Sequence, residues 1–567
     1  MKIAYSGFLL HHALTSLGHE VFLLPGVSSS GSGDANPLFL PVLQSICPQP
    51  DLVFLELWQE KNLPPDMHSI PFPTAVWCID SPINSFWQIP LSALFDHVFV
   101  DQKNVIDSFA SAGSTAHWLP LCAQKGLFTP VNKPRQHGLS FVGRLSAARQ
   151  KRNNLVAFLK ERYPLHLVTA GANVREEFGI SHATINENLF DGVNLRVFQA
   201  TATGTLLLTE KNSSGLESCF TPGEDLLVYE PHTLAPLLDS LFHCIANPAA
   251  TLADGKSLAH YQAIARHGQE TCHKRHSASV RAGEMLEILA SSPSQKKGHL
   301  ERLAGLAQAE YALRQKYGGM LDTARSTIKK ALQLHTDVPP AASAPRPADK
   351  PPPPTAEQKL LYSLGLMESR KLNYTSALQY FADAGHHPMP TVMTALVFLY
   401  QGDVAAALTT LLPFLSHGEQ DYALAGPAQA GYTGPPDDPA VQKSLVLYLA
   451  SQVLLRENRV VDLGFTKTSD DLFPETALAM LQLAWKVWPE PFLLDAILDC
   501  AHSVGRAGEL LHLLLTAIER NQATDLQMVR AAELAESYYN KPIAIRIIRA
   551  LQQARVVSKL HGWTGDK

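Results

Sequence analysis

Short apolar runs alternate with helical stretches along residues 1–130 of the chain. The runs are KIAYSG, HEVFLLPG, DLVFLEL, TAVWCID and HVFVD, and each is short enough to form one strand. Continuous apolar strands that alternate with helices indicate a parallel sheet covered by helices on both faces. We therefore predict a Rossmann-like domain over residues 1–130.

The same alternation starts again in the next part of the chain. Its apolar runs are LSFVGR, LHLVTAG, TLLLT and DLLVYEP, and a charged helix is expected from about Ala147 to Arg162. These runs predict a second Rossmann-like domain over residues 131–292. Two such domains in tandem leave a cleft between them, and open α/β sheets bind ligands at the carboxyl ends of their strands.

Helix-forming residues then replace the alternation. We expect a helical extension over residues 293–335 and a proline-rich linker over residues 336–358, whose prolines favour extended polyproline II. Residues 359–567 predict an α-helical array, in which Leu378 and Leu408 start similar helices, 30 residues apart, near the period of tetratricopeptide-like pairs. The expected fold class is α/β, with two Rossmann-like domains followed by an all-α helical-repeat region.

The composition is typical of a soluble globular protein, with 46% hydrophobic and 17% charged residues. A formal net charge of −5 at pH 7 gives no general attraction to polyanions, so we expect no nucleic acid partner. The seven cysteines form no CxxC pair, which indicates reduced thiols and neither a zinc site nor a disulfide frame. No apolar run reaches the ~18 residues of a transmembrane helix. We therefore expect a cytoplasmic protein.

A cation-rich strand end stands out in the second domain. In FVGRLSAARQKR a strand ends at Gly143, and four cations follow within nine positions. Gly143 lets a ligand approach the backbone, and the forked donors of Arg144 and Arg149 can grip a diphosphate. We assign Lys151 and Arg152 to a solvated helix face.

The first domain offers three candidate residues. Gly7 follows a strand and precedes a helix, so the backbone amides there are predicted to receive an anion or a sugar hydroxyl. His11 is a candidate catalytic residue in contact with the substrate, although such histidines commonly lie on a helix surface. Asp80 stands just past the strand TAVWCID and could act as a general base, or as a turn or cap residue before Ser-Pro. No DxD-like pair lies at a strand end, so we predict no catalytic metal.

The order of GHEV, WCIDSP, SFVGR, NLRVFQATATG and FTPGEDLLVYEP resembles the GT-B glycosyltransferases, in particular the group similar to the spore maturation protein CgeB. The resemblance covers roughly the first half of the chain and is most specific in the second domain. It implies transfer of a sugar from a nucleotide-diphosphate sugar, which is a co-substrate, with no further cofactor. The first domain would take the acceptor and the second domain the donor.

The resemblance also implies donor-binding residues. In GT-B families of this kind, a Glu-x7-Glu element holds the donor sugar and the nucleotide ribose, and the matching positions here are Asp191 and Gln199. Gln199 can hydrogen-bond a ribose diol without the charge of a carboxylate. Arg196 would contact a phosphate, or it would brace the loop by a salt bridge to Asp191 or Glu187. Asn194 belongs to the same donor-facing segment.

Two further positions complete the predicted donor side. Gly204 ends the helix of NLRVFQATATG and lets the buried strand TLLLT begin. Glu217 would support the ribose or simply cap the next element.

The leading hypothesis is a hexosyltransferase in which Arg144 and Arg149 neutralise the leaving diphosphate. The helical array would recruit a protein or polysaccharide acceptor, or another protein partner. Two alternatives stay open. One is a catalytically weak or inactive GT-B-like scaffold that uses its helical repeats for protein interaction, and the other is an epimerase or phosphorylase acting on activated sugars.

Overall fold

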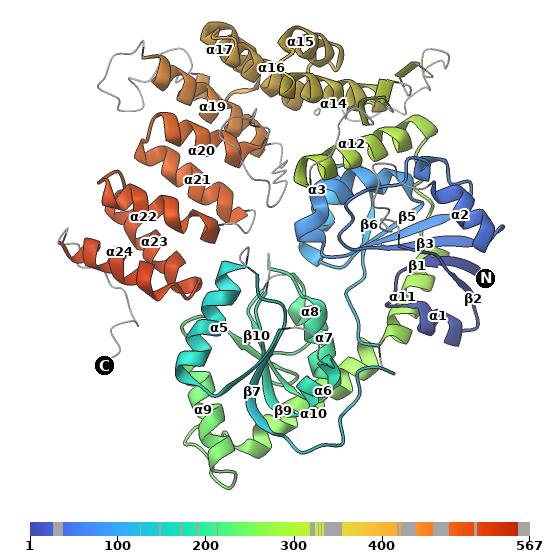
Figure 1. The fold of residues 1–567 in the computed structure, drawn as a ribbon, viewed down its shortest axis with the longest axis vertical. Coiled ribbons are helices and arrows are strands. Elements are labelled where there is room, and N and C mark those ends of the chain that lie inside the picture. Colours follow the sequence, from blue (N-terminus) through green and yellow to red (C-terminus); the bar gives the residue numbers. More distant parts are fainter. Residues whose placement is uncertain are drawn as a thin grey trace.

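The computed structural model shows two parallel sheets and an arch of helices that spans them (Figure 1). The structure describes residues 1–26, 38–124, 126–146, 149–169, 173–188, 191–212, 214–317, 324–326, 328–329, 332–333, 354–416, 419–420, 438–456, 474, 476–503 and 507–553. Among the helices in these ranges, none is long and apolar enough to span a bilayer.

The first domain is built on a six-stranded parallel sheet in the order β2-β1-β3-β4-β5-β6. Every residue of β3 and β4 is buried, because helices cover both faces of the sheet. The strands are β1 (Lys2–Ser6), β2 (Glu20–Leu23), β3 (Leu52–Leu57), β4 (Thr74–Cys78), β5 (His97–Val100) and β6 (Ala116–Trp118). The α-helices are α1 (His11–Ser16), α2 (Phe39–Ile46), α3 (Ser81–Leu91) and α4 (Ile106–Ser111).

The second domain has a five-stranded parallel sheet in the order β11-β10-β9-β7-β8. Its strands are β7 (His137–Val142), β8 (Leu165–Val168), β9 (Ser181–Asn186), β10 (Leu206–Glu210) and β11 (Leu227–Tyr229). Its helices are α5 (Gln150–Arg162), α6 (Val174–Gly179), α7 (Leu195–Ala202), α8 (Leu216–Cys219), α9 (Leu234–Ala246) and α10 (Leu258–Arg275). The charged helix predicted from about Ala147 thus begins at Gln150.

Both sheets place their first strand between the second and the third strand along the chain, at β1 and at β7. At such a point the connections leave the sheet in opposite directions and open a crevice at the carboxyl ends of the strands. The predicted pair of Rossmann-like domains is therefore confirmed.

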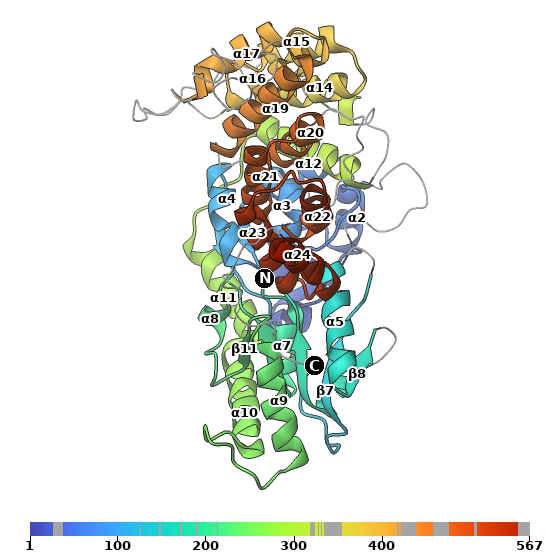
Figure 2. The ribbon, with the colours of Figure 1, turned by 90° about the vertical axis from the view of Figure 1, so that its left-hand side faces the viewer.

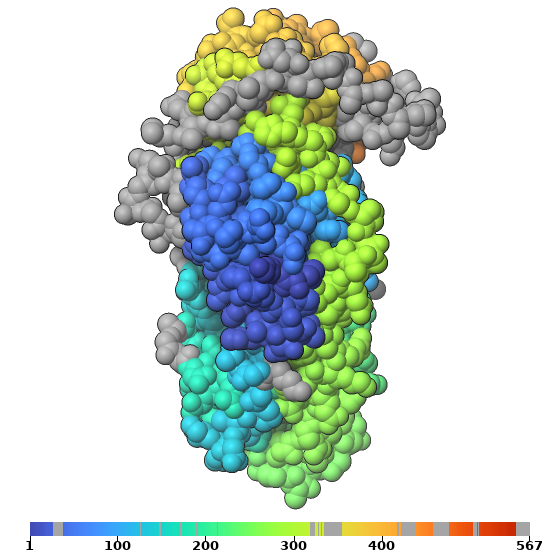
Figure 3. All heavy atoms as spheres, turned by 90° about the vertical axis from the view of Figure 1, so that its right-hand side faces the viewer, coloured from blue at the N-terminus to red at the C-terminus, as the bar shows by residue number. Residues whose placement is uncertain are grey.

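Helix α11 (Ala278–Ser291) leads the chain from the second domain back to the first, where it packs on α1. Figure 3 shows this return as a continuous band along one side of the molecule. Beyond α11, Gln295 donates to the carbonyl of Thr115 at 2.7 Å and Lys296 to that of Phe72 at 2.9 Å. The chain thus stays attached to the first domain before the helical array begins.

The helical array starts with α12 (His299–Tyr317), which packs on α3, and ends beside α5 (Figures 1 and 2). Its further α-helices are α14 (Ala356–Arg370), α15 (Tyr374–Asp383), α16 (Pro388–Tyr400), α17 (Val404–Leu411), α19 (Pro439–Arg456), α20 (Ala477–Val487), α21 (Pro491–Ser503), α22 (Leu511–Glu519), α23 (Asp525–Ser537) and α24 (Lys541–Gln553). Neighbouring helices pack in pairs around one apolar core.

The predicted proline-rich linker lies mostly outside the described residues, which resume at residue 354. Its last part is helical, because Thr355 and Gln358 form a capping box that starts α14 at Ala356. The array therefore begins before the predicted end of the linker.

Candidate active site

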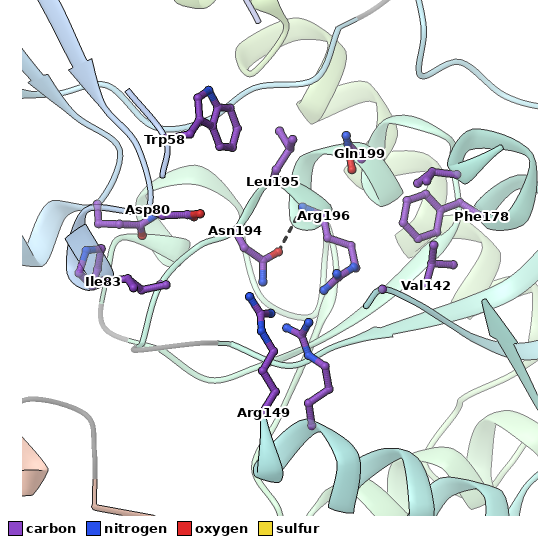
Figure 4. A pocket seen from close by; sticks show the side chains of 16 residues that line it. Trp58, Asp80, Ile83, Val142, Arg149, Phe178, Asn194, Leu195, Arg196 and Gln199 are labelled. Atoms are coloured by element: carbon purple, nitrogen blue, oxygen red, sulfur yellow. Dashed lines mark hydrogen bonds between the residues drawn. The ribbon is translucent and has the colours of Figure 1, made fainter. Parts of the chain in front are cut away.

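A cavity of about 320 Å³ lies between the two sheet domains. The first domain contributes Trp58, Asp80 and Gln102 to its wall, each just beyond a strand, and the second contributes residues from the starts of α5 and α7 (Figure 4). The cavity therefore sits where the carboxyl ends of the two sheets face each other, as expected for open α/β domains. Its size is within the range of small-molecule sites.

Three arginines from the second domain line the cavity. Arg149 directly precedes α5, Arg152 lies in the first turn of α5, and Arg196 lies in the first turn of α7. Figure 4 shows the guanidinium ends of Arg149 and Arg196 pointing toward each other. The two helices thus deliver their first-turn cations to one place.

The three guanidinium groups differ in their partners. Arg152 is almost fully buried and pairs with Glu187, with nitrogen to oxygen distances of 2.8 Å. Arg196 donates to the Asn186 side-chain oxygen at 2.8 Å. With the residues that the structure describes, the Arg149 side chain forms no hydrogen bond or ion pair. Arg149 is therefore the cation best placed to receive a ligand.

The charges of these three side chains would favour an anion in the cavity. Burial and the nearby Arg152 lower the pKa of Arg196 to about 9. Burial and Arg152 also lower the pKa of Arg149. Guanidinium groups carry a positive charge in proteins near neutral pH. The carboxylate of Glu187 forms its ion pair with Arg152. A bound anion would relieve the repulsion among the three cations.

A buried amide network orients Arg196. Asn186 ends β9, and its side-chain oxygen accepts from Asn194 at 3.0 Å as well as from Arg196. Its amide donates to Asn188 at 3.0 Å and to Thr209 at 3.1 Å. Because all these partners are satisfied, the network holds the guanidinium of Arg196 in one position.

The sequence reasoning missed the roles of Asn186 and Glu187. The signal is weak, because SHATINEN mixes polar residues with Ala183 and Ile185 and is not one of the apolar runs that predicted the other strands. The strand β9 itself was therefore missed. For the predicted brace between Arg196 and Glu187, the structure shows a different pattern of bonds. Arg196 donates to Asn186 and Glu187 pairs with Arg152, while the Glu187 charge still attracts Arg196.

The predicted solvated face for Lys151 and Arg152 is also wrong. Arg152 is 2% exposed, and Lys151 pairs with Glu210 at the end of β10. The first turn of α5 lies over the carboxyl ends of β9 and β10, so its cations meet buried carboxylates. Charge pattern alone does not reveal which face of a helix meets a sheet.

Of the residues at the cation-rich strand end, some line the cavity and others do not. Arg144 is exposed and does not line the cavity, and its carbonyl accepts from Arg152 at 3.3 Å. Gly143 does line the cavity, and a Cβ there would lie 2.5 Å from a terminal nitrogen of Arg196. The glycine thus makes room for the side chain of Arg196.

Asp80 faces the arginines from the first domain (Figure 4). It occupies the N-cap position of α3 with a left-handed φ of 51°, but its side chain makes no capping bond. Asp101 caps the helix instead, accepting from the backbone amides of Asp80 at 2.9 Å and Ser81 at 3.1 Å. The structure therefore leaves the Asp80 carboxyl available to the cavity.

Asp80 is also electrostatically unusual. Its burial and the charge of Asp101 raise the pKa of its carboxyl to about 6, against the opposite effect of Arg149. A carboxyl with this pKa exchanges a proton close to neutral pH, as a general acid or base must.

The glycine loop of the first domain differs from its prediction. The carboxylate of Glu56 accepts from the backbone amides of Phe8 at 2.9 Å, Leu9 at 3.0 Å and Leu10 at 3.3 Å. These amides are therefore occupied by the chain itself, and the prediction that they receive a ligand is wrong. Gly7 instead accommodates Glu56, whose carboxyl carbon would lie 2.5 Å from a Cβ at that position.

The remaining predicted residues divide between the cavity and its surroundings. Asn194 and Gln199 line the cavity, and Asn194 also caps α7 by accepting from the Arg196 amide at 3.1 Å. Four predicted residues do not line the cavity: His11, Asp191, Gly204 and Glu217. His11 stacks on the ring of Tyr5, and Asp191 directly precedes the cavity residue Gly192. Gly204 lies beyond the carboxyl end of α7, and Glu217 is exposed.

Gln102 joins the two domains at the cavity. Its side-chain amide donates to the Val193 carbonyl at 3.0 Å, and its side-chain oxygen accepts from the Val193 amide at 2.7 Å. The sequence gives no signal for this pair, because it forms only when the domains are in place. Across the described ranges, no group of three or more His, Cys, Asp or Glu side chains could hold a metal ion.

Two Rossmann-like sheets that face each other across a cavity define a GT-B arrangement. The family model described as Glycosyl transferase-like matches residues 145–287, which span most of the second domain. The sheet half of the chain thus has a glycosyltransferase-like GT-B fold. A search of curated proteins found no match.

Several solved structures are similar to about half of the chain. Sucrose-phosphate synthase from Thermosynechococcus elongatus has 12% identity, and the alignment covers 52% of this chain and 100% of that chain with a TM-score of 0.38. HepE from Anabaena, solved with UDP and glucose, has 13% identity over 51% of this chain and 100% of that chain, with a TM-score of 0.36. A glycosyltransferase from Rickettsia africae has 12% identity, and the alignment covers 51% of this chain and 97% of that chain with a TM-score of 0.36.

Proposed function

We propose that the protein is a glycosyltransferase that moves a hexosyl group from a nucleotide-diphosphate sugar to an acceptor hydroxyl. The observation that carries this proposal is the convergence of Arg149, Arg152 and Arg196 opposite Asp80. Guanidinium groups suit a diphosphate, because their forked donors match its oxygens. The match of residues 145–287 to a glycosyltransferase-like family supports the same assignment.

The proposed reaction is a single displacement. The acceptor oxygen forms a bond to the anomeric carbon, and the bond from that carbon to the diphosphate oxygen breaks. The electron pair of the broken bond leaves with the nucleoside diphosphate, and the hydroxyl proton passes to Asp80. This scheme inverts the anomeric centre.

The arginines act on the leaving group. Negative charge grows on the diphosphate as its bond to the sugar breaks, and positioned cations stabilise that charge in the transition state. We propose that Arg149 makes the direct contact and that Arg152 and Arg196 supply the surrounding field, in place of a metal ion. The nucleotide sugar is a co-substrate, and the scheme needs no other cofactor.

Gln199 and Asn194 line the cavity beside Arg196 and are proposed to orient the donor. The Gln199 amide can bind a ribose diol through both its oxygen and its nitrogen. Such neutral hydrogen bonds are weaker than those of a carboxylate, so we expect moderate donor affinity.

The acceptor side is proposed from the architecture. A protein or polysaccharide acceptor would be recruited by the helical array, since helical repeats form extended surfaces. Assignment to the CgeB-like group, a tetratricopeptide-like character of the array and a cytoplasmic location belong to this proposal.

A thermal-shift screen tests the proposal. The purified protein is heated with UDP, GDP, dTDP or ADP and their common sugar conjugates, because a ligand bound only by the native state raises the melting temperature. We expect a rise with one nucleotide that is lost in Arg149→Ala. The matched variant Arg144→Ala removes an exposed arginine outside the cavity, so it should keep the shift.

The outcomes separate the hypotheses. Loss of the shift in Arg144→Ala but not in Arg149→Ala would move the diphosphate site to the strand end. No shift with any nucleotide would favour the GT-B-like scaffold, whose work is done by the helical array. A nucleotide sugar that is bound and isomerised without an acceptor would favour an epimerase.

A further inference from the structure

The two ends of the helical array hold different sheet domains. Helix α12 packs on α3 of the first domain, and the turn between α23 and α24 packs on α5 of the second (Figures 1 and 2). The array is therefore fixed to both walls of the cavity and not only to the end of the sheet half.

The contact with α3 is close. A Cβ at Gly305 of α12 would lie 2.4 Å from the carbonyl oxygen of Pro90 in α3, so only glycine allows this approach. The ammonium of Lys316 lies 4.6 Å from the centre of the Phe86 ring. Leu306 and Leu313 of α12 belong to the apolar core of the first domain.

The other end of the array packs equally closely on α5. Tyr539 is 7% exposed and belongs to the apolar core of the second domain, with its ring centre 5.5 Å from that of Phe158. Asn154 of α5 donates to the carbonyl of Tyr538 at 3.0 Å. The Lys151 ammonium lies 5.4 Å from the centre of the Tyr538 ring.

The two helices that the array contacts, α3 and α5, begin next to the charged residues on opposite walls of the cavity. Helix α3 begins directly after Asp80, and α5 begins directly after Arg149. Movement of either helix would displace the charged residue at its start. Reactions that depend on orientation lose rate steeply when the groups are misplaced by about 1 Å.

We propose that the helical array is a bracket that holds α3 and α5, and with them Asp80 and Arg149, at their working separation. Tyr539 and Asn154 are positioning residues in this arrangement, because they act through α5 without touching the cavity. The inference rests on the proposed function for the nature of the ligand, but the mechanical coupling does not depend on it.

The experiment compares three full-length variants with the wild type. Tyr539→Ala removes the ring from the core of the second domain, and Tyr539→Phe keeps it. Tyr448→Ala is the matched control, because Tyr448 is a half-buried tyrosine that packs on Phe492 and on the apolar core of the array. Amide hydrogen exchange of residues 150–162 is measured together with the affinity for UDP and the steady-state kcat and KM.

Tyr539→Ala is expected to speed amide exchange in the first turns of α5 and leave β7 and β9 protected. UDP affinity should fall by at least about tenfold, and kcat should fall as well. Tyr539→Phe and Tyr448→Ala should match the wild type in all three measurements. If Tyr539→Ala does not fold, Asn154→Ala serves instead, because it removes only the hydrogen bond to the Tyr538 carbonyl.

Unchanged exchange in α5 together with unchanged UDP affinity in a folded Tyr539→Ala would overturn the bracket. An equal loss in Tyr448→Ala would also overturn it, because a general loss of array stability would then explain the effect. If the wild type binds neither UDP nor another nucleotide, the proposed function fails. The exchange data then decide the bracket alone.

Discussion

Asp80 is the residue whose protonation decides whether the proposed transfer can begin. Burial and the charge of Asp101 raise the pKa of its carboxyl to about 6. A proton acceptor must be deprotonated, so the proposed activity falls as the pH drops through this value. Above it the activity is constant until the pH nears about 9, where Arg196 loses its charge. We expect the profile of kcat/KM against pH to show one acid limb with an apparent pKa of about 6.

Asp80→Asn separates this role from simple binding. The amide keeps the size of the side chain but cannot take the proton, so kcat should fall by about 10²- to 10⁴-fold. The affinity for the nucleoside diphosphate should change little, because the arginines belong to the other domain. A pH profile of the variant is the check, and an acid limb that persists there would assign the ionisation to another group.

Single residues were predictable where the signal is local. A strand that ends in glycine and is followed by cations is visible in the sequence, and it pointed to Gly143 and Arg149, which line the cavity, and to Arg144, which does not. Arg196 was predicted from the family resemblance. The assignment of Arg152 failed because its partner, Glu187, is 35 positions away and becomes a neighbour only when α5 lies over β9. Partners of this kind need the packed sheet.

At the scale of elements, the turn from β1 to α1 shows how one glycine, Gly7, leaves space for a carboxylate that is distant in the sequence, that of Glu56. Gly7 has a φ of +153°, and a Cβ there would meet the Glu56 carboxyl group, which three backbone amides hold in place. Gly7→Ala should therefore lower the free energy of unfolding by about 1–3 kcal/mol through backbone strain and collision. Urea unfolding of the purified variant measures this loss.

Gly18→Ala is the comparison for that loss. Gly18 also has a positive φ, of +87°, but no atom lies within 4 Å of the position of its Cβ. Gly18→Ala should therefore suffer the backbone strain without the collision, and its loss of unfolding free energy should be smaller than that of Gly7→Ala. Equal losses in both variants would mean that the Glu56 carboxylate simply moves aside.

The same turn explains why elements were easier to predict than their ends. Most of the buried strands appear in the sequence as apolar runs, because both faces of a parallel sheet are covered. The exception is the buried strand β9, whose sequence SHATIN carries Ser181, His182 and Thr184. The carboxylate that fills the β1–α1 turn comes from a residue 48 positions further on, in β3. A free anion site and an occupied one thus have the same local sequence.

At the scale of the whole molecule, α12 joins the first domain to the helical array through two apolar faces. Leu306, Ala309 and Leu313 belong to the core of the first domain. Ala304, Ala307 and other residues on the opposite face belong to the core of the array. Because one rigid helix is part of two cores, neither core can open along it without exposing the other.

This shared helix predicts how the protein unfolds. We expect the first domain and the array to melt in one calorimetric transition, with proteolytic fragments from both parts appearing at the same temperature. Gly305→Leu should separate them, because its side chain would collide with the Pro90 carbonyl and push α12 away from α3. The array would then melt at a lower temperature than the sheet half.

Gly283→Leu is the matched change, since Gly283 lies inside α11 and has no atom within 4 Å of its Cβ position. It should leave the single transition intact. Separate melting of the array in the wild type would contradict the shared core and would weaken the bracket as well, because a helix that opens independently cannot hold α3 in place. A common transition that Gly305→Leu divides would instead show that the array is part of the cavity's frame.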